Sequence, residues 1–114
     1  MWNIDWTEEY KDWFKTLDEE SKEAVFERVL LLKEYGPLLG RPYADVLHGS
    51  KCMNLKELRA HAGNHILRVA FCFDTVRNAV LLIGGDKKGK KEKLFYKKLI
   101  ADAEKLIEKY KFRI

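Results

Sequence analysis

Two strand-like segments meet at Gly63-Asn64, and this turn constrains the fold more than any other feature of the chain. A Gly-Asn pair flanked by strand-like runs is a strong signal for a two-residue hairpin loop. Residues then pair outward from the turn, which sets Arg59 directly opposite Arg68. Like charges that face each other across a sheet are unfavourable. A bound anion would remove that penalty, and a guanidinium suits a phosphate.

Length and composition indicate one domain spanning residues 1–114, with 46% hydrophobic residues and a formal net charge of +4. That apolar content is enough for a single core and too high for disorder. Cys52 and Cys72 have no metal-ligand spacing, so we expect reduced thiols, buried or idle, in a cytoplasmic protein. We expect no membrane span and no signal peptide, because no apolar run is long enough and the first residues lack a basic region followed by an apolar stretch.

Hydrophobic periodicity predicts an α+β fold with the element order βααβββα, in which an antiparallel sheet packs against helices. For the second helix, Thr16 and Asp18 are rival N-caps. The expected segments are a strand at 2–6, a helix of about ten residues capped by Thr7, a second helix ending at Tyr35, a loop over 37–54, strands at about 55–61, 65–73 and 79–84, and a helix at about 91–110.

The same periodicity predicts which side chains are buried. The middle strand is expected to turn one face to the core and to carry the arginine on the other. The predicted core face of that strand is Leu67, Val69, Phe71 and Phe73, and its second face is Ile66, Arg68, Ala70 and Cys72. The second helix is expected to bury Val25, Val29 and Leu32 with Phe26 and Leu30, and the last helix to bury Phe95, Leu99, Ala103, Leu106 and Tyr110.

The two arginines admit two interpretations. They form either a phosphate site that stabilises developing charge or a surface ion-pair ladder with Glu57, which lies diagonally from Arg68. The basic segment 86–93 is likewise either a phosphate site at the start of the last helix or a solvated turn. Tyr96 is expected to face the edge of the sheet, where it either binds a base or a phosphate or simply packs.

Other groups of residues argue against a nucleotide-binding loop, a paired-histidine mechanism and a metal site. Gly84, Gly89 and Lys90 match most of a Walker A loop, but Lys91 stands where magnesium needs Ser or Thr. In the proposed register His61 shares the face of Arg59 whereas His65 points the other way. A paired-histidine mechanism is therefore not supported, and the spacing of the histidines indicates no metal site.

Three stretches of the chain resemble one known family. They are LGRPYADVLHGSKCMNLKELR, FCFDTVRNAVLLIGGDKKG, and FYKKLI with the later ADAEKL. Together they resemble the HigB-type, phage Gp49-like toxins of the RelE/ParE superfamily, and the likeness covers nearly the whole chain.

The resemblance implies a ribosome-dependent mRNA endonuclease that needs no metal or other cofactor. The ribose 2′-hydroxyl attacks the adjacent phosphorus and the 5′-oxygen leaves. It also implies three partners, namely the 70S ribosome, mRNA, and a cognate helix-turn-helix antitoxin of HigA type encoded next to the toxin.

The resemblance also implies roles for particular residues. Arg68 would stabilise the phosphate, Glu57 would orient or deprotonate the 2′-hydroxyl, and Tyr96 would lie near the base stack. Lys87 falls near the leaving group, where electrostatic stabilisation suits it better than acid catalysis, since a solvated lysine has a pKa near ~10.4. The implied RNA-binding residues are Arg59, Lys56, Lys88, Lys90 and Lys91.

Two alternative functions stay open. ParE-like members of the superfamily inhibit DNA gyrase by protein binding and do not cut RNA. The basic segment 86–93 also allows a nucleic-acid-binding module without catalysis. The expected placement of Arg59, Arg68, Glu57 and Tyr96 on one surface favours the nuclease.

Overall fold

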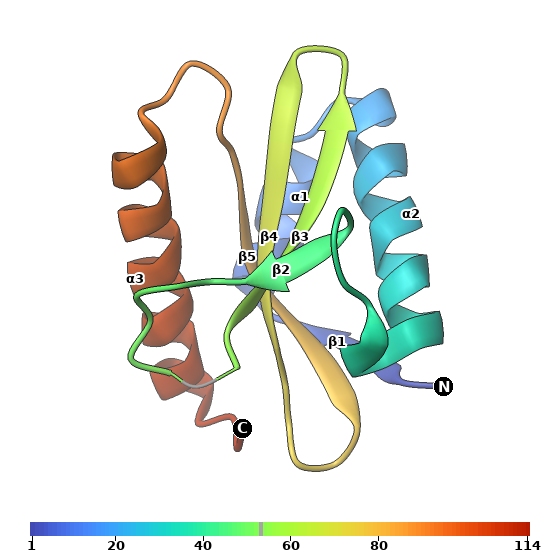
Figure 1. Cartoon of the computed structure of the whole chain (residues 1–114), viewed down its shortest axis with the longest axis vertical. Helices are drawn as coiled ribbons and strands as arrows, with labels where there is room; N and C mark the ends of the chain where they lie inside the picture. Colours follow the sequence, from blue (N-terminus) through green and yellow to red (C-terminus); the bar gives the residue numbers. More distant parts are fainter. Residues whose placement is uncertain (53) are drawn as a thin grey trace.

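The chain folds into three layers, with a five-stranded sheet held between helices (Figure 1). This computed structural model describes residues 1–52 and 54–114. Helices α1 and α2 pack on one face of the sheet and α3 packs on the other. The elements are β1 (Asn3–Trp6), α1 (Glu8–Lys15), α2 (Glu19–Tyr35), the 3-10 helix η1 (Gly36–Leu38), β2 (Ala44–Val46), β3 (Lys56–Ala62), β4 (His65–Phe73), β5 (Asn78–Asp86) and α3 (Glu92–Tyr110).

The fold class and the element order are confirmed, and the sheet has strand order β1-β5-β4-β3-β2. Its pairings are antiparallel as predicted, except at one edge. There β1 runs parallel to β5, with Asn3 beside Asn78. The connection from β1 to β5 runs through α1, α2 and the strands β2 to β4, so it is long enough for a parallel pair. At the other edge, β2 lies inside the segment that was expected to be a loop and pairs antiparallel with β3.

The hairpin between β3 and β4 has the predicted register. Ala62 pairs with His65 and Arg59 pairs with Arg68. Gly63 has a φ of +56°. A glycine with positive φ at the first central position is the arrangement of a type II′ turn, whose twist suits a hairpin. This turn sets the two arginines opposite each other.

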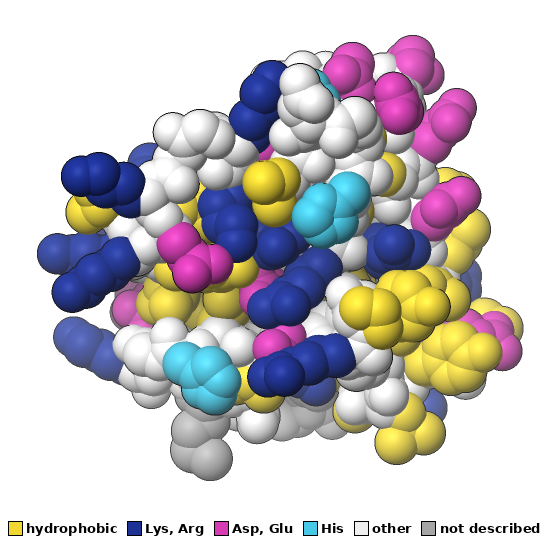
Figure 2. All heavy atoms as spheres, turned by 45° about the horizontal axis from the view of Figure 1, so that its top comes forward, with side chains coloured by type: hydrophobic (Ala, Val, Ile, Leu, Met, Phe, Trp, Pro, Cys, Tyr) yellow, Lys and Arg dark blue, Asp and Glu magenta, His cyan; other side chains and the backbone are white. Residues whose placement is uncertain are grey.

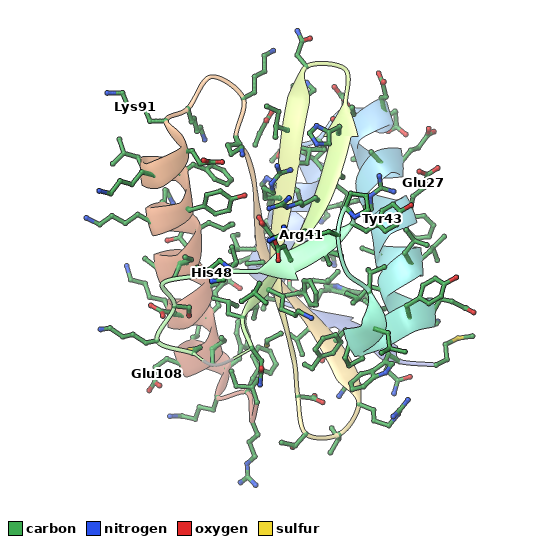
Figure 3. The ribbon with its side chains drawn as sticks, viewed as in Figure 1. Glu27, Arg41, Tyr43, His48, Lys91 and Glu108 are labelled. Carbon is green, nitrogen blue, oxygen red and sulfur yellow. The ribbon has the colours of Figure 1, made fainter. Side chains whose placement is uncertain are left out.

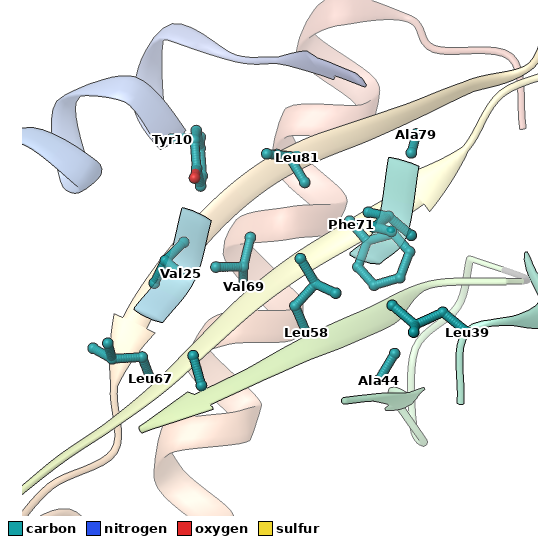
Figure 4. Close-up of a cluster of buried hydrophobic side chains, with 12 residues drawn as sticks. Tyr10, Val25, Leu39, Ala44, Leu58, Leu67, Val69, Phe71, Ala79 and Leu81 are labelled. Atoms are coloured by element: carbon teal, nitrogen blue, oxygen red, sulfur yellow. The ribbon is translucent and has the colours of Figure 1, made fainter. Parts of the chain in front are cut away.

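Both faces of β4 are buried, which the sequence pattern did not predict. On the first face Leu67, Val69 and Phe71 pack against α1 and α2, as expected (Figure 4). On the second face Ala70 and Cys72 are covered by α3. Arg68 lies on that covered face and is only 6% exposed. The arginine expected at the surface is therefore buried.

The helices differ from expectation at a few positions. Asp18 caps α2 by accepting a hydrogen bond from the Ser21 backbone at 2.7 Å, whereas Thr16 ends α1. Phe26 and Leu30 are 55% and 50% exposed, because α2 presents only its Val25 and Leu32 side to the sheet. In α3 the expected apolar line is buried as far as Leu106, but Tyr110 is 37% exposed.

Gly84, the first glycine of the Walker-like match, and its neighbour Gly85 have packing roles in β5. A Cβ at Gly84 would lie 2.3 Å from the indole of Trp13, and one at Gly85 would lie 3.0 Å from the ring of Phe95. Trp13 on α1 and Phe95 on α3 therefore approach the strand backbone from opposite faces. These glycines allow both helices to dock close to the sheet.

Both cysteines are free thiols, and burial raises the pKa of the Cys72 thiol to about 12. A thiol with such a pKa is not nucleophilic at neutral pH. In the described ranges, no helix combines the length and the apolar character needed to cross a membrane.

We expect Gly84→Ala to lower the free energy of unfolding by about 1–3 kcal/mol, because the new methyl group must displace Trp13 or shift β5. The measurement is urea unfolding at neutral pH. Gly40→Ala is the matched control, since a Cβ there meets nothing within 4 Å. Equal unfolding midpoints for the two variants would contradict this account of the glycine.

Candidate active site

The carboxylate of Glu57 lies at the centre of a polar cluster on the α3 side of the sheet. Glu57 lies on β3 and is only 2% exposed. Its Oε1 accepts a hydrogen bond from the hydroxyl of Tyr96 at 2.8 Å. Its Oε2 accepts hydrogen bonds from Nε and Nη2 of Arg59, both at 3.1 Å. Both oxygens of a nearly inaccessible carboxylate are thus engaged by charged or polar donors.

Arg68 completes the centre of the cluster from β4. Its Nε donates to the hydroxyl of Tyr96 at 3.0 Å and lies 3.5 Å from Oε1 of Glu57. Its Nη1 donates to the backbone oxygen of Leu67 at 3.0 Å. The guanidinium is therefore held in one orientation from two directions, and the Tyr96 hydroxyl bridges it to the carboxylate.

The chain itself supplies an anion for the two opposed arginines. Glu57 is the shared partner of Arg59 and Arg68, which the ion-pair interpretation of the sequence proposed. The pairs are buried or half-buried, however, and do not form a surface ladder. Breaking a buried pair by removing one partner typically costs about 3–5 kcal/mol, because it leaves an uncompensated charge.

Tyr96 reaches the cluster because of its place on α3. Phe95 and Leu99 bury the helix against the sheet, and the next residue along is turned about 100° from Phe95. Tyr96 therefore lies over β3 and β4, and the expectation that it faces the sheet edge is wrong. Burial raises the pKa of Tyr96, the Glu57 carboxylate acts in the same direction, and Arg68 opposes them. Its hydroxyl thus stays protonated at neutral pH.

Lys87 joins the cluster from the end of β5. Its backbone N–H donates to the Ile66 oxygen at 2.7 Å, and the preceding Asp86 accepts from the backbone of Ile66 and Lys88. The Lys87 side chain is 17% exposed and its Nζ lies 2.8 Å from Oε1 of Glu92. The same Nζ lies 5.4 Å from the centroid of the Tyr96 ring. This lysine therefore adds a positive charge at one rim of the cluster.

The opposite rim contains residues that the sequence did not single out. Asp45 on β2 accepts from Nε of Arg41 at 2.9 Å and lies 3.5 Å from Nη2 of Arg59. Arg28 on α2 donates to the backbone oxygen of Arg59 at 2.8 Å. Figure 2 shows this face, where Lys and Arg side chains gather near the centre with Asp or Glu side chains among them. In Figure 3 Arg41 is labelled beside β2.

The other expected RNA-binding residues lie outside this cluster. Lys56 points to the opposite sheet face from Glu57, since side chains alternate along β3, and its Nζ lies 5.8 Å from the Phe73 ring. Lys88, Lys90 and Lys91 are exposed between β5 and α3. Lys90 and Lys91 line a groove with Trp13, and Arg68 is not among the residues that line it.

The histidines lie as the register predicts. His61 is exposed, and its pKa is lowered, first by partial burial and then by the positive charges of Arg68, Arg28, Lys87 and Arg59. His65 binds Asp86 at 2.6 Å on the other side of the hairpin. Since the two imidazoles lie on opposite faces of the hairpin, they do not form an acid–base pair.

The fold of this chain is similar to that of a solved RelE protein. A solved structure of similar fold is the archaeal RelE–RelB complex from Pyrococcus horikoshii OT3, with a TM-score of 0.58, 16% identity, and coverage of 79% of this chain and 98% of that chain. Residues 12–108 match the family described as "Phage derived protein Gp49-like", and the chain belongs to that family. The resemblance to the Gp49-like family is thereby confirmed.

Two curated relatives come from Mycobacterium tuberculosis (strain ATCC 25618 / H37Rv). One is named "Putative toxin HigB2" and is 36% identical over 110 residues, covering 93% of this chain and 55% of that protein. The other is named "Putative toxin HigB3" and is 46% identical over 77 residues, covering 68% of this chain and 66% of that protein. The chain thus spans between about half and two thirds of the length of these relatives.

Tyr96→Phe should lower the free energy of unfolding by about 1–3 kcal/mol, because it removes the hydroxyl that bridges Arg68 and Glu57 in a buried site. Chemical denaturation at neutral pH gives this value. Tyr110→Phe is the control, since that hydroxyl binds Glu9 on an exposed surface. A Tyr96→Phe protein as stable as Tyr110→Phe would show that the bridge contributes nothing to the fold.

Proposed function

We propose that the chain is the toxin of a type II toxin–antitoxin system and cleaves translated mRNA as a ribosome-dependent endonuclease. The relatives that carry HigB toxin names and the RelE-like fold support this proposal. The observation that carries it is the environment of Arg68. Two bonds fix this guanidinium, while its Nη2 group has no hydrogen-bond partner among residues 1–52 and 54–114. A fixed guanidinium with free donors suits a phosphate.

The proposed reaction is an internal transfer within the RNA. The 2′-oxygen attacks the neighbouring phosphorus and the 5′-oxygen leaves, which yields a cyclic phosphate and a free 5′-hydroxyl. The 2′-hydroxyl must lose a proton, the leaving oxygen must gain one, and the phosphorane charge must be neutralised. Arg68 neutralises the phosphorane in this proposal. Lys87 adds positive charge on the side of the leaving 5′-oxygen, which takes its proton from solvent water.

The proton route in the proposal runs through Tyr96. Glu57 is too deeply buried to meet a ribose directly, but the Tyr96 hydroxyl is hydrogen-bonded to its Oε1. As Tyr96 accepts the proton of the 2′-hydroxyl, it passes its own proton to Glu57. Glu57 is then the base and Tyr96 the group that touches the substrate. Arg59 holds Glu57 and contributes positive charge for the RNA backbone.

We also propose the partners that this function requires. They are the 70S ribosome with its mRNA, and a cognate helix-turn-helix antitoxin of HigA type, with the toxin acting in the cytoplasm. The similar archaeal RelE was solved in complex with RelB, which supports an antitoxin partner. Lys88, Lys90 and Lys91 are exposed and are proposed to contact RNA at the edge of the site. Lys56 faces away and is not proposed to contact the substrate.

One observation favours a second candidate, a toxin that acts by protein binding as ParE-like proteins do on DNA gyrase. Helix α2 and the turn after it expose Phe26, Leu30, Tyr35 and Leu38, by 55%, 50%, 53% and 89%. Exposed apolar side chains in proximity are typical of protein-binding surfaces. An antitoxin would equally use such a surface, so this surface does not distinguish the two candidate functions. The buried arginine cluster favours the nuclease.

The decisive variant is Arg68→Lys, which keeps a positive charge beside Glu57 but loses the planar fork. We expect single-turnover cleavage on programmed ribosomes to fall by about 10²–10³-fold, because a donor to the developing phosphorane is lost. The toxic effect of expression without antitoxin should fall in parallel. Arg68→Ala should be destabilised as well, since the buried Glu57 loses one of its partners.

Arg77→Lys is the matched control, because Arg77 stacks on Trp2 in the turn between β4 and β5. Circular dichroism establishes that both lysine variants are folded. Cleavage by folded Arg68→Lys at the wild-type rate would refute the catalytic assignment. Growth arrest with intact mRNA and damaged DNA would instead favour the gyrase alternative.

A further inference from the structure

A hollow in the surface lies next to the polar cluster around Glu57 and has no role in the proposed cleavage reaction. It lies between α3 and the loop that follows β2, and its volume is about 520 Å³. That size falls in the ordinary range of sites for small organic groups. The side chains that matter in its lining are His48 from the loop and Lys93, Tyr96, Lys97, Ile100 and Glu104 from α3. In Figure 3 His48 lies between β2 and α3. We call this the α3 hollow.

The α3 hollow is continuous with the proposed active site through one residue. The ring of Tyr96 lines the hollow, while its hydroxyl binds Arg68 and Glu57. A polymer with one phosphate at Arg68 can therefore place its neighbouring unit at this hollow. The two regions are also alike in charge, because both contain positively charged side chains.

The charges of the α3 hollow suit a phosphate. Lys93 and Lys97 are one helical turn apart and both are exposed. Like charges at that spacing repel each other, and a bound anion relieves the repulsion. Within the chain as described, neither ammonium is in an ion pair, whereas the adjacent Lys98 lies 2.6 Å from Asp102. The two lysines are thus available to a ligand.

Glu104, the acidic residue of the lining, has a structural role. Its Oε2 accepts hydrogen bonds from the hydroxyl of Ser50 at 2.9 Å and from the backbone of Lys51 at 2.6 Å. These bonds tie the loop that carries His48 to α3. The carboxylate therefore holds the far wall of the hollow in place, and the two lysines outnumber it in charge.

The remaining lining suits a base. An imidazole, a phenol ring and the aliphatic side chain of Ile100 offer flat or apolar surfaces, on which bases of any sequence stack. We propose that the α3 hollow binds the nucleotide next to the cleaved bond of a single-stranded RNA, with its phosphate at Lys93 and Lys97 and its base against His48. This inference rests on the proposed nuclease function, since it takes RNA as the ligand.

The test measures binding without cleavage. The probe is a fluorescein-labelled, mixed-sequence hexamer of 2′-O-methyl RNA, which lacks the attacking hydroxyl, and the readout is fluorescence anisotropy over a range of salt concentrations. Lys93→Gln/Lys97→Gln should bind at least about tenfold more weakly. Its plot of log affinity against log salt should be shallower by about 1.4, because each contact with a single strand contributes about 0.7. His48→Ala should also weaken binding, by about tenfold, with an unchanged slope.

The matched control is Lys98→Gln/Lys105→Gln, which removes the same charge from other faces of the same helix. Equal losses in the two double variants, or no binding of the probe by the wild type, would overturn the subsite. Suppose that Arg68→Lys fails to cleave on ribosomes while Lys93→Gln/Lys97→Gln binds and cleaves like the control. That result supports the nuclease function and refutes the subsite. Suppose instead that the wild type never cleaves, and that only Lys93→Gln/Lys97→Gln has a lower probe affinity and a shallower salt dependence. That result supports the α3 hollow as an RNA site and refutes the nuclease function.

Discussion

The buried carboxylate of Glu57, shared by two opposed arginines, is the interaction on which the arrangement of this site depends. The hairpin register forces Arg59 and Arg68 to face each other, and α3 covers the face on which they lie. Two guanidinium groups in that setting need a nearby anion. Glu57 supplies it and, through Tyr96, also binds α3 to the sheet. The same contacts therefore compensate the charges, dock the helix and orient the side chains proposed to act on RNA.

This arrangement explains how a small domain can present strong positive charge and remain folded. At the centre Glu57 is nearly inaccessible, so the RNA of the proposed function would not compete with it. At the rims the carboxylates are more accessible, since Glu92 and Asp45 have side chains that are 71% and 17% exposed. An RNA phosphate would replace such rim contacts with Lys87 and Arg59 and leave the centre intact. Preorganised charge of this kind is the main source of transition-state stabilisation in many enzymes.

Local rules predicted much of the fold. A Gly-Asn turn and the two-residue repeat of strands were enough for the hairpin, the opposed arginines and the placement of Glu57 beside them. The same alternation puts Lys56 on the sheet face opposite Glu57, which the sequence pattern already indicates. Other features depend on tertiary packing. The contact between Glu57 and Tyr96 joins residues far apart in sequence, the short β2 forms only beside β3, and nothing local distinguishes the exposed Phe26 and Leu30 from the buried Val25.

The most direct test of the central claim is the stability of Glu57→Gln in urea, measured with and without inorganic phosphate. The account predicts a loss of about 3–5 kcal/mol relative to the wild type, because the opposed arginines lose their anion. It also predicts that phosphate restores part of this loss by binding between Arg59 and Arg68, and that it stabilises the wild type less. A Glu57→Gln protein as stable as the wild type, with an equal response to phosphate, would contradict the account.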